Sequence, residues 1–219
     1  MYNIAIDGPS GVGKSTLAKA LAKRLNITYL DTGAMYRAMA WKALSLGIDP
    51  SDEMAVSAFV DDVVIDVRYK DGVQQIFVDG TDVSVAIREH HMSKASSQVS
   101  KHPIVRAKLV AMQREIASRQ SVVLDGRDIT SVVLPDAKYK FFLTAKAEVR
   151  AKRRVKELEA KGDKVDFAKI LKDIEERDYN DSHRAISPLV FTQDSVLVDS
   201  SDMNAEEVLD YILSFIKEE

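Results

Sequence analysis

A glycine-rich stretch near the beginning of the chain has the composition and spacing of a phosphate-binding loop. Residues 8–15 read GPSGVGKS, which fits the pattern G-x-x-x-x-G-K-[ST]. The glycines let the backbone fold around an anion with its N–H groups turned inward, so that Lys14 can reach the β- and γ-phosphates and Ser15 can bind Mg²⁺ directly. The residues expected to bind ATP are Gly8, Pro9, Ser10, Gly11, Val12, Gly13, Lys14, Ser15 and Thr16.

The chain also offers a carboxylate and several arginines that suit phosphoryl transfer. Asp125 ends the apolar run 122–124, a place from which it can hold Mg²⁺ through water, although a helix or turn cap is the alternative. Arginine suits phosphate because its planar fork binds bidentately and keeps its charge. Arg127 and Arg37 both follow the ends of apolar runs, which face the ligand crevice in open α/β sheets. Arg150 and Arg119 lie in helical patterns and are interpreted as solvated.

Other nucleotide-dependent classes need motifs that this chain lacks. A GTPase would carry D-x-x-G and N-K-x-D, and neither occurs in the sequence. A motor ATPase would usually be longer and would carry an acidic pair where glycine follows Asp125. The motifs therefore favour a small kinase.

Composition narrows the partners and the compartment. The net charge of −3 argues against binding to a nucleic acid polymer. The chain has no cysteine, which excludes thiol catalysis, disulfides and Cys-based zinc sites. No stretch approaches the length of a membrane span, and the first residues lack the features of a signal peptide. We expect a cytoplasmic protein with no membrane partner.

Alternating strand and helix patterns predict an α/β fold. Apolar runs at 2–6, 27–30, 122–124, 139–143 and 196–198 predict buried strands, while helical spacing predicts helices from 14, from 35, and over 104–117, 148–160, 167–178 and 206–216. Residues 63–67 and 75–78 predict a hairpin through Asp71-Gly72, with a second turn at Asp79-Gly80. The expected fold class is a P-loop NTPase-type parallel sheet flanked by helices, with a small antiparallel insert and a short lid.

Six segments of the chain resemble bacterial cytidylate kinases, which belong to the P-loop nucleoside monophosphate kinases. They are GPSGVGKST (8–16), LDTGAMYR (30–37), SSQVSKHPIVR (96–106), LDGRDI (124–129), PDAKYKFFLTA (135–145) and ERDYNDSHRAISPL (176–189), in family order over nearly the whole chain. The resemblance implies a monomer that transfers the γ-phosphoryl group of ATP to CMP or dCMP with Mg²⁺. It also implies one domain over 1–219, with a core at 1–58, 104–150 and 185–219, an insert at about 59–103 and a lid at about 151–184.

The resemblance assigns roles at matching positions. Cytosine would be read by Ser97, Arg106 and Asp128, and the acceptor phosphate would be held by Arg37, Arg127 and Arg184. Arg177 and Asp181 would contact the sugar, Tyr36 would line the same pocket, and Arg153 and Arg154 would close over the transferring group. The residues expected to bind CMP are Thr32, Gly33, Tyr36, Arg37, Ser97, Arg106, Arg127, Asp128, Arg177, Asp181 and Arg184, and those expected in catalysis are Lys14, Arg127, Arg153, Arg154 and Arg184.

The cytosine assignment has a physical reason. Cytosine presents an amino donor beside a ring-nitrogen acceptor, and uracil reverses both. Asp128 would accept from the amine and Arg106 would donate to the acceptors, so uracil would leave both groups unpaired. Ser97 as a helix cap and Arg106 as an exposed helical charge remain the alternatives.

The chain departs from the family pattern at Thr130-Ser131, where Gly-Thr is common, and this change can alter the local turn. Two other functions stay open at this point. One is a P-loop kinase for another acceptor, such as shikimate, gluconate or a different nucleotide. The other is a regulatory protein that binds ATP and has no acceptor.

Overall fold

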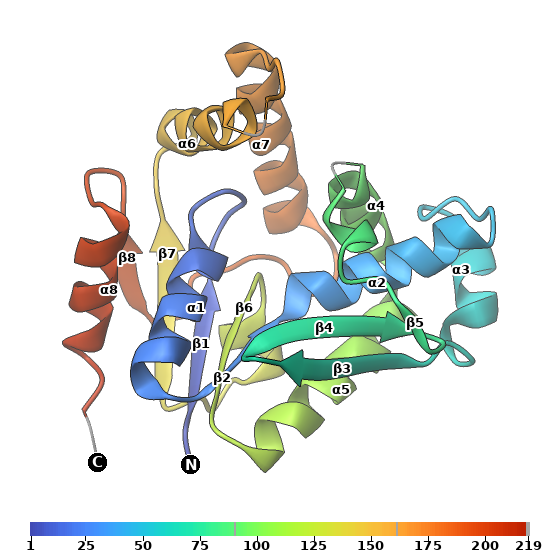
Figure 1. Ribbon diagram of the computed structural model, residues 1–219, viewed down its shortest axis with the longest axis horizontal. Helices are drawn as coiled ribbons and strands as arrows, with labels where there is room; N and C mark the ends of the chain where they lie inside the picture. The colour runs from blue at the N-terminus through green and yellow to red at the C-terminus, as the bar shows by residue number, and fades with distance from the viewer. Residues whose placement is uncertain (90, 161, 218–219) are drawn as a thin grey trace. The chain divides into compact units, whose positions relative to one another are not determined.

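The computed structural model describes residues 1–89, 91–160 and 162–217. The chain forms two compact units (Figure 1): unit 1 comprises Met1–Ile27 and Val122–Glu219, and unit 2 comprises Thr28–Ser121. Unit 1 contains the phosphate-binding loop and the segment predicted as a lid. Unit 2 contains the predicted insert with the segments that flank it in the sequence.

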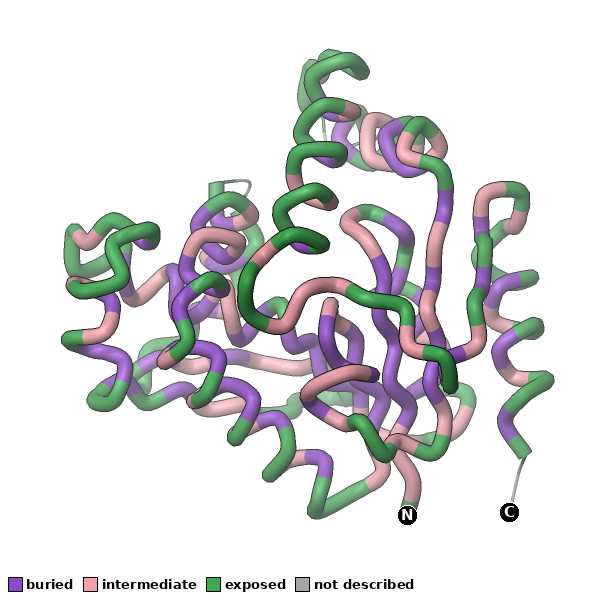
Figure 2. The backbone as a smooth tube through the Cα atoms, turned by 180° about the vertical axis from the view of Figure 1, so that it is seen from behind, coloured by how far each residue is buried: buried purple, intermediate pink, exposed green. Residues whose placement is uncertain are grey.

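Unit 1 is built on a parallel sheet. Its strands are β6 (Val122–Gly126), β1 (Asn3–Asp7), β7 (Tyr139–Thr144) and β8 (Val196–Asp199), side by side in that order. The apolar side chains of β1 and β6 are fully buried, and both strands run through the purple centre of Figure 2. Strands covered on both faces need such unbroken apolar runs. Asp7 pairs with Gly126 and Phe142, so the carboxyl ends of three strands meet at one edge.

The helices of unit 1 follow these strands. They are α1 (Lys14–Leu25), α6 (Ala147–Glu159), α7 (Phe167–His183) and α8 (Ala205–Leu213), with one π-helical turn at Ile129–Val133. α1 packs against α8, which begins with a capping box formed by Asn204 and Glu207. α6 and α7 pack on each other through a small apolar core of Ala151, Leu158, Ile170 and Ile174.

Unit 2 joins helices to an antiparallel sheet. After β2 (Thr28–Asp31) come α2 (Thr32–Ser45) and α3 (Glu53–Val60), then β3 (Ile65–Lys70), β4 (Val73–Val78) and β5 (Thr81–Asp82). A 3₁₀ turn at Ala86–Arg88 leads to α4 (Met92–Val99) and α5 (Pro103–Arg119). The hairpin closes through Asp71 and Gly72, whose φ angles of 53° and 74° are those of a two-residue primed turn.

The predicted fold class is confirmed, since a parallel sheet with flanking helices and a separate antiparallel sheet are both present. Several details differ from the sequence prediction, the largest of them in the helices. α3 and α4 were not predicted, and α7 continues to His183 instead of ending at Asp178. α4 has the polar sequence MSKASSQV and owes its stability to packing against α2. The last turn of α7 has little apolar periodicity because the buried residue there is a carboxylate, Asp181.

Among the described residues, none of the helices combines the length and the apolar character that crossing a membrane requires.

Candidate active site

The phosphate-binding loop links β1 to α1 in unit 1, as the motif predicts. Gly8 has a φ of 150°, and a Cβ there would lie 2.0 Å from the carbonyl oxygen of Leu143, so that only glycine fits. Gly13 is the residue before α1 and lies in the left-handed region, with a φ of 99°. It provides no side-chain cap, so the first N–H groups of α1 remain directed at the loop. Such a helix start is an anion site.

Lys14 is buried, with 5% of its surface exposed, and its ammonium group turns back on the loop. Its Nζ donates to the carbonyl oxygens of Gly8 and Pro9, both at 2.7 Å. Burial lowers the pKa of Lys14 well below its ordinary value, and the nearby Arg127 guanidinium lowers it further, against the opposing effect of Asp125. A phosphate in the loop would favour the charged ammonium again, because it supplies the missing counter-charge.

Ser15 and Asp125 provide two neighbouring oxygen groups. The Ser15 hydroxyl donates to the Asp125 carboxylate at 2.9 Å. Mg²⁺ is usually held by one or two such protein oxygens together with phosphate and water, and not by an all-protein cage. Within the described ranges there is no group of three or more His, Cys, Asp or Glu that could hold a metal ion. The Ser15 hydroxyl and the Asp125 carboxylate fit a Mg²⁺ ion that arrives with a nucleotide.

An ion-pair cluster in unit 1 connects the β6 end to α7. Arg127 donates from Nε to Asp181 at 2.6 Å, and Arg177 approaches the same carboxylate at 3.9 Å. Arg184 lies 3.7 Å from Asp128, and the side chains of both are at least nine-tenths buried. The structure thus brings together five residues that the sequence analysis took from two separate segments.

The paired groups in this cluster shift each other's pKa toward the charged form. Burial works to lower the pKa of Arg127, but the Asp181 carboxylate, with Asp125 and Asp178, works against it, and the net pKa is raised. Burial likewise works to raise the pKa of Asp181, and Arg127 and Arg177 reverse this, so that the net pKa is lowered. Both groups therefore stay ionised, and the cluster as a whole sets three arginines against two carboxylates.

Asp7 holds the segment that carries Arg127 and Asp128, and the sequence analysis did not foresee this role. Its carboxylate is fully buried and accepts from the backbone N–H of Ile129 at 2.9 Å. It also accepts from the N–H and the hydroxyl of Thr130, both at 2.7 Å. The departure at Thr130 thus has a local partner for its hydroxyl. The only sequence signal was a carboxylate at the end of a buried strand.

A cavity of about 330 Å³ opens beside the loop, entirely within unit 1. Arg153 and Arg154 of α6 line it, together with loop residues Gly11 to Gly13. The segment between β8 and α8 completes its wall, and Arg153 donates to the carbonyl oxygens of Ser200 at 2.6 Å and Met203 at 3.2 Å. The sequence analysis missed this segment, although a loop at the carboxyl end of a parallel strand is a common ligand site. The residues added to the candidate site are Leu17, Ala20, Leu143, Glu157, Ser200, Met203, Asn204, Ala205 and Val208.

In unit 2, the predicted acceptor residues Thr32, Gly33, Tyr36 and Arg37 form the first turns of α2. Asp31 caps this helix by accepting from the N–H of Ala34 at 2.9 Å and pairs with Arg88 at 2.8 Å. Arg37 donates to the carbonyl oxygen of Ile87 at 3.3 Å. The 3₁₀ turn that carries Ile87 and Arg88 therefore fixes the start of α2, which the sequence analysis did not anticipate.

The predicted base-reading residues of unit 2 come from α4 and α5. Ser97 lies inside α4 and is not the cap considered from the sequence. Arg106 is 3% exposed, donates to the carbonyl oxygen of Ser100 at 3.2 Å and lies over the ring of Tyr36. It is therefore not an exposed helical charge. Asp128, the third predicted reader, belongs to unit 1.

Comparison with known proteins identifies the family of this chain. Residues 4–218 match the family model described as cytidylate kinase. The chain is 49% identical over 214 residues to the cytidylate kinase of Desulforamulus reducens, which covers 98% of this chain and 96% of that one. It is 46% identical over 211 residues to the cytidylate kinase of Caldicellulosiruptor bescii, with coverages of 96% and 93%. An uncharacterized protein of known structure from Eubacterium ventriosum aligns over 100% of both chains, with a TM-score of 0.53 at 14% identity, a likeness of fold alone. Because the family model spans almost the whole sequence and the relatives are nearly half identical to it, the chain belongs to the cytidylate kinase family.

Proposed function

We propose that the chain transfers the γ-phosphoryl group of ATP to CMP or dCMP, which gives ADP and CDP or dCDP. The observation that carries this proposal is the phosphate-binding loop, with buried Lys14 and with Ser15 hydrogen-bonded to Asp125, in a chain of the cytidylate kinase family. The support for CMP or dCMP as the acceptor is the name of the family and of the relatives. The support for ATP as the phosphoryl donor is the geometry of the loop in unit 1.

We infer that ATP binds wholly within unit 1. Its phosphates would lie in the loop and at the start of α1, where backbone N–H groups and Lys14 face an anion. The cavity beside the loop, at about 330 Å³, is large enough for a heterocyclic base. Arg153 and Arg154 line this cavity, so both would lie close to the nucleotide.

Ser15 would hold Mg²⁺ directly and Asp125 would hold it through water, and the ion's chemistry is to neutralise charge on the β- and γ-phosphates. The residues of the chain then supply position and charge. Lys14 and the arginine cluster stabilise the negative charge that spreads over the transferring group. The acceptor oxygen is already anionic at neutral pH, so that no general base is required.

For the acceptor, we propose that Arg37, Arg127 and Arg184 hold the phosphate and that Arg177 and Asp181 contact the sugar. Thr32, Gly33 and Tyr36 would line the same pocket, and Ser97, Arg106 and Asp128 would read the base. The buried, permanently charged forks of Arg127 and Arg184 suit a phosphate, which would compete with their present carboxylate partners. Asp128 and Arg106 suit the donor and acceptor pattern of cytosine and oppose that of uracil.

The test is ADP release in the presence of Mg-ATP across CMP, dCMP, UMP, AMP and shikimate. Fast turnover with CMP and dCMP, and at least about 10²-fold less with UMP, is the expected result. A Lys14→Ala preparation purified in parallel reports any contaminating kinase. Turnover with another acceptor would leave the proposed ATP site intact and refute the assignment of the cytosine-reading residues. Tight ATP binding without turnover on any acceptor would refute the proposed phosphoryl transfer.

A further inference from the structure

Two side chains outside the assigned site hold the backbone of the phosphate-binding loop. The N–H of Ser10 donates to Oδ1 of Asp178 at 3.0 Å, and Nη1 of Arg150 donates to the carbonyl oxygen of Ser10 at 2.9 Å. Arg150 and Asp178 also pair directly with each other through the second carboxylate oxygen. The three contacts close a ring through the backbone N–H and C=O of one loop residue, which we call the Ser10 clamp.

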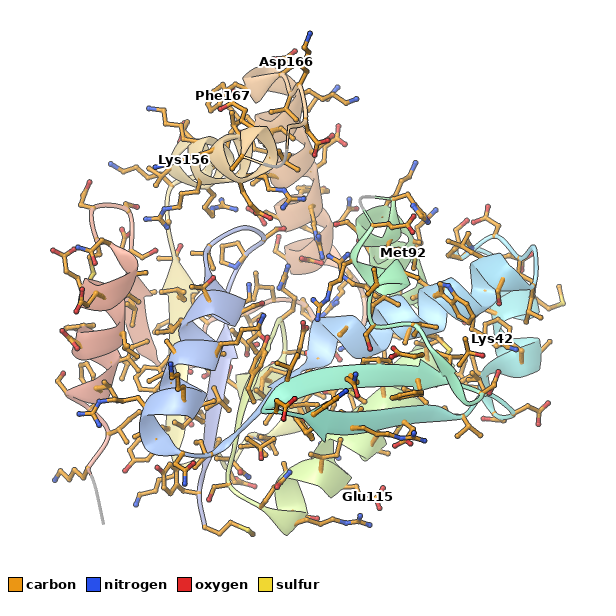
Figure 3. All side chains as sticks on the ribbon, in the orientation of Figure 1. Lys42, Met92, Glu115, Lys156, Asp166 and Phe167 are labelled. Atoms are coloured by element: carbon orange, nitrogen blue, oxygen red, sulfur yellow. The ribbon has the colours of Figure 1, made fainter. Side chains whose placement is uncertain are left out.

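The clamp comes from the α6–α7 pair of unit 1. Arg150 lies in the first turns of α6 and is anchored by a hydrogen bond from its Nε to the carbonyl oxygen of Ala145 at 2.8 Å. Asp178 lies near the end of α7, whose opposite end is marked by Asp166 and Phe167 in Figure 3. A Cβ on Gly11 would contact Arg150 and Ile174, so this part of the loop packs directly against both helices.

Burial indicates that the clamp is more than a surface ion pair. The side chain of Arg150 is 7% exposed and that of Asp178 is 22% exposed. A buried charge is costly unless its partner and further hydrogen bonds satisfy it, and here both partners also bind the backbone of Ser10. Arg150 also neutralises Asp178, whose charge would otherwise oppose phosphate binding in the loop.

Asp178 connects the loop to the arginine cluster along one helix. It is preceded by Arg177 and followed, one turn later, by Asp181, which binds Arg127. The same face of α7 therefore contacts the phosphate-binding loop through Asp178 and the cluster through Asp181. A shift of α7 would move both, and phosphoryl transfer is sensitive to displacements of about 1 Å.

We propose that Arg150 and Asp178 are positioning residues, which fix the phosphate-binding loop relative to the α6–α7 arginines through the backbone of Ser10. The inference rests on the proposed function for its effect on turnover, but its effect on ATP binding does not depend on the acceptor. Neither side chain needs to touch a substrate. Their removal would loosen the ATP site and misalign the groups that act on the γ-phosphate.

The experiment compares Arg150→Ala, Asp178→Ala and the double variant with the unchanged protein. Controls are Lys152→Ala and Asp173→Asn, which alter exposed residues on the same two helices. Mg-ATP affinity is measured by calorimetry without acceptor, and kcat and KM for ATP are then measured with CMP. We expect each single variant to raise the Kd for Mg-ATP about 10-fold and to lower kcat about 10- to 100-fold, with both controls within twofold. The double variant should be no worse than the poorer single one, because the residues act as one unit.

Asp178→Asn gives a milder variant if the alanine variants fail to fold. It keeps an oxygen that can accept from the N–H of Ser10 but loses the charge that pairs with Arg150. An intermediate rise in Kd for Mg-ATP supports the clamp. Native Kd, kcat and KM in folded Arg150→Ala or Asp178→Asn protein, with only a lower Tm, would overturn it. If the unchanged protein does not use CMP, the proposed function fails while the Kd comparison still tests the clamp.

Discussion

The two units hold their functional arginines in different ways. In unit 1, Arg127 and Arg150 are paired with carboxylates and largely buried, and the nearby Lys14 is buried as well. In unit 2, Arg37 and Arg106 donate to backbone carbonyl oxygens, and the ion pairs Arg88–Asp31 and Lys42–Asp79 keep one partner at the surface. Buried charges interact more strongly because water does not screen them. We propose on this basis that unit 1 supplies most of the charge for the chemical step, while Arg37 and Arg106 of unit 2 act on the acceptor.

Replacing Lys14 should produce the largest effect. Lys14→Ala removes an ammonium group that would contact the transferring phosphate, so kcat should fall about 10²- to 10³-fold with every acceptor. Stability should change little, because the ammonium is buried in the free protein and its pKa is lowered by that burial. The matched control is Lys23→Ala, which alters an exposed lysine on the same helix. Near-native turnover of the Lys14→Ala variant would contradict the proposal that charged groups of unit 1 act in the chemical step.

Replacing Arg106 tests the role given to unit 2. Arg106→Ala should lower the ratio of kcat/KM for CMP over UMP about 10²-fold, because the acceptor groups of cytosine lose their donor. Mg-ATP affinity should stay native. Arg119→Ala is the control, since Arg119 lies on the same helix with its side chain 72% exposed. An equal loss with all acceptors, and an unchanged ratio, would contradict the division between the units.

Local motifs of the chain were predictable from the sequence, and long-range polar contacts were not. The position of the phosphate-binding loop was predictable because glycines at fixed spacing allow backbone angles that other residues rarely adopt. The Asp71-Gly72 hairpin was predictable for the same reason. Arg150 was interpreted as solvated, because its role depends on Ser10 and Asp178, which are distant in sequence and carry no local signal. Asp7 and the Ser200–Met203 wall of the cavity were missed for the same reason. Long-range pairing of polar groups, and not the elements themselves, limited the prediction of the site.

The pH dependence of stability should separate two buried aspartates of unit 1. The pKa of Asp181 is lowered by Arg127 and Arg177 against the effect of burial, so it stabilises the fold above its ordinary value of 3.8, and this contribution is lost as the pH falls through the lowered pKa. Burial raises the pKa of Asp7, whose ionisation therefore costs stability as the pH rises from 3.8. Urea unfolding from pH 3 to 7 measures both. Asp181→Asn should lower the free energy of unfolding by about 2 kcal/mol at pH 7 and flatten the acid limb, since a charged hydrogen bond is lost.

A flattened acid limb in the Asp173→Asn control, which alters an exposed residue of α7, would show that the effect comes from net charge and not from the cluster. An Asp181→Asn variant with the native pH profile would mean that Arg127 is held without its carboxylate. Either result would weaken the idea that paired charge organises unit 1.

The smallest effect on stability is expected from the hydrogen bonds that join α5 to the end of α3 in unit 2. Lys108 of α5 donates to the carbonyl oxygens of Val60 and Val63, both at 2.6 Å, and of Asp61 at 3.1 Å, and so satisfies the end of α3. Lys108→Met keeps the apolar stem and removes the donors, which should lower the free energy of unfolding by about 1 kcal/mol. The exposed Lys101→Met should be neutral. Because these hydrogen bonds go to backbone oxygens alone, kcat with CMP should stay native in the folded variant, whereas a fall in kcat beyond about tenfold would mean that the α3–α5 contact also positions groups of the active site.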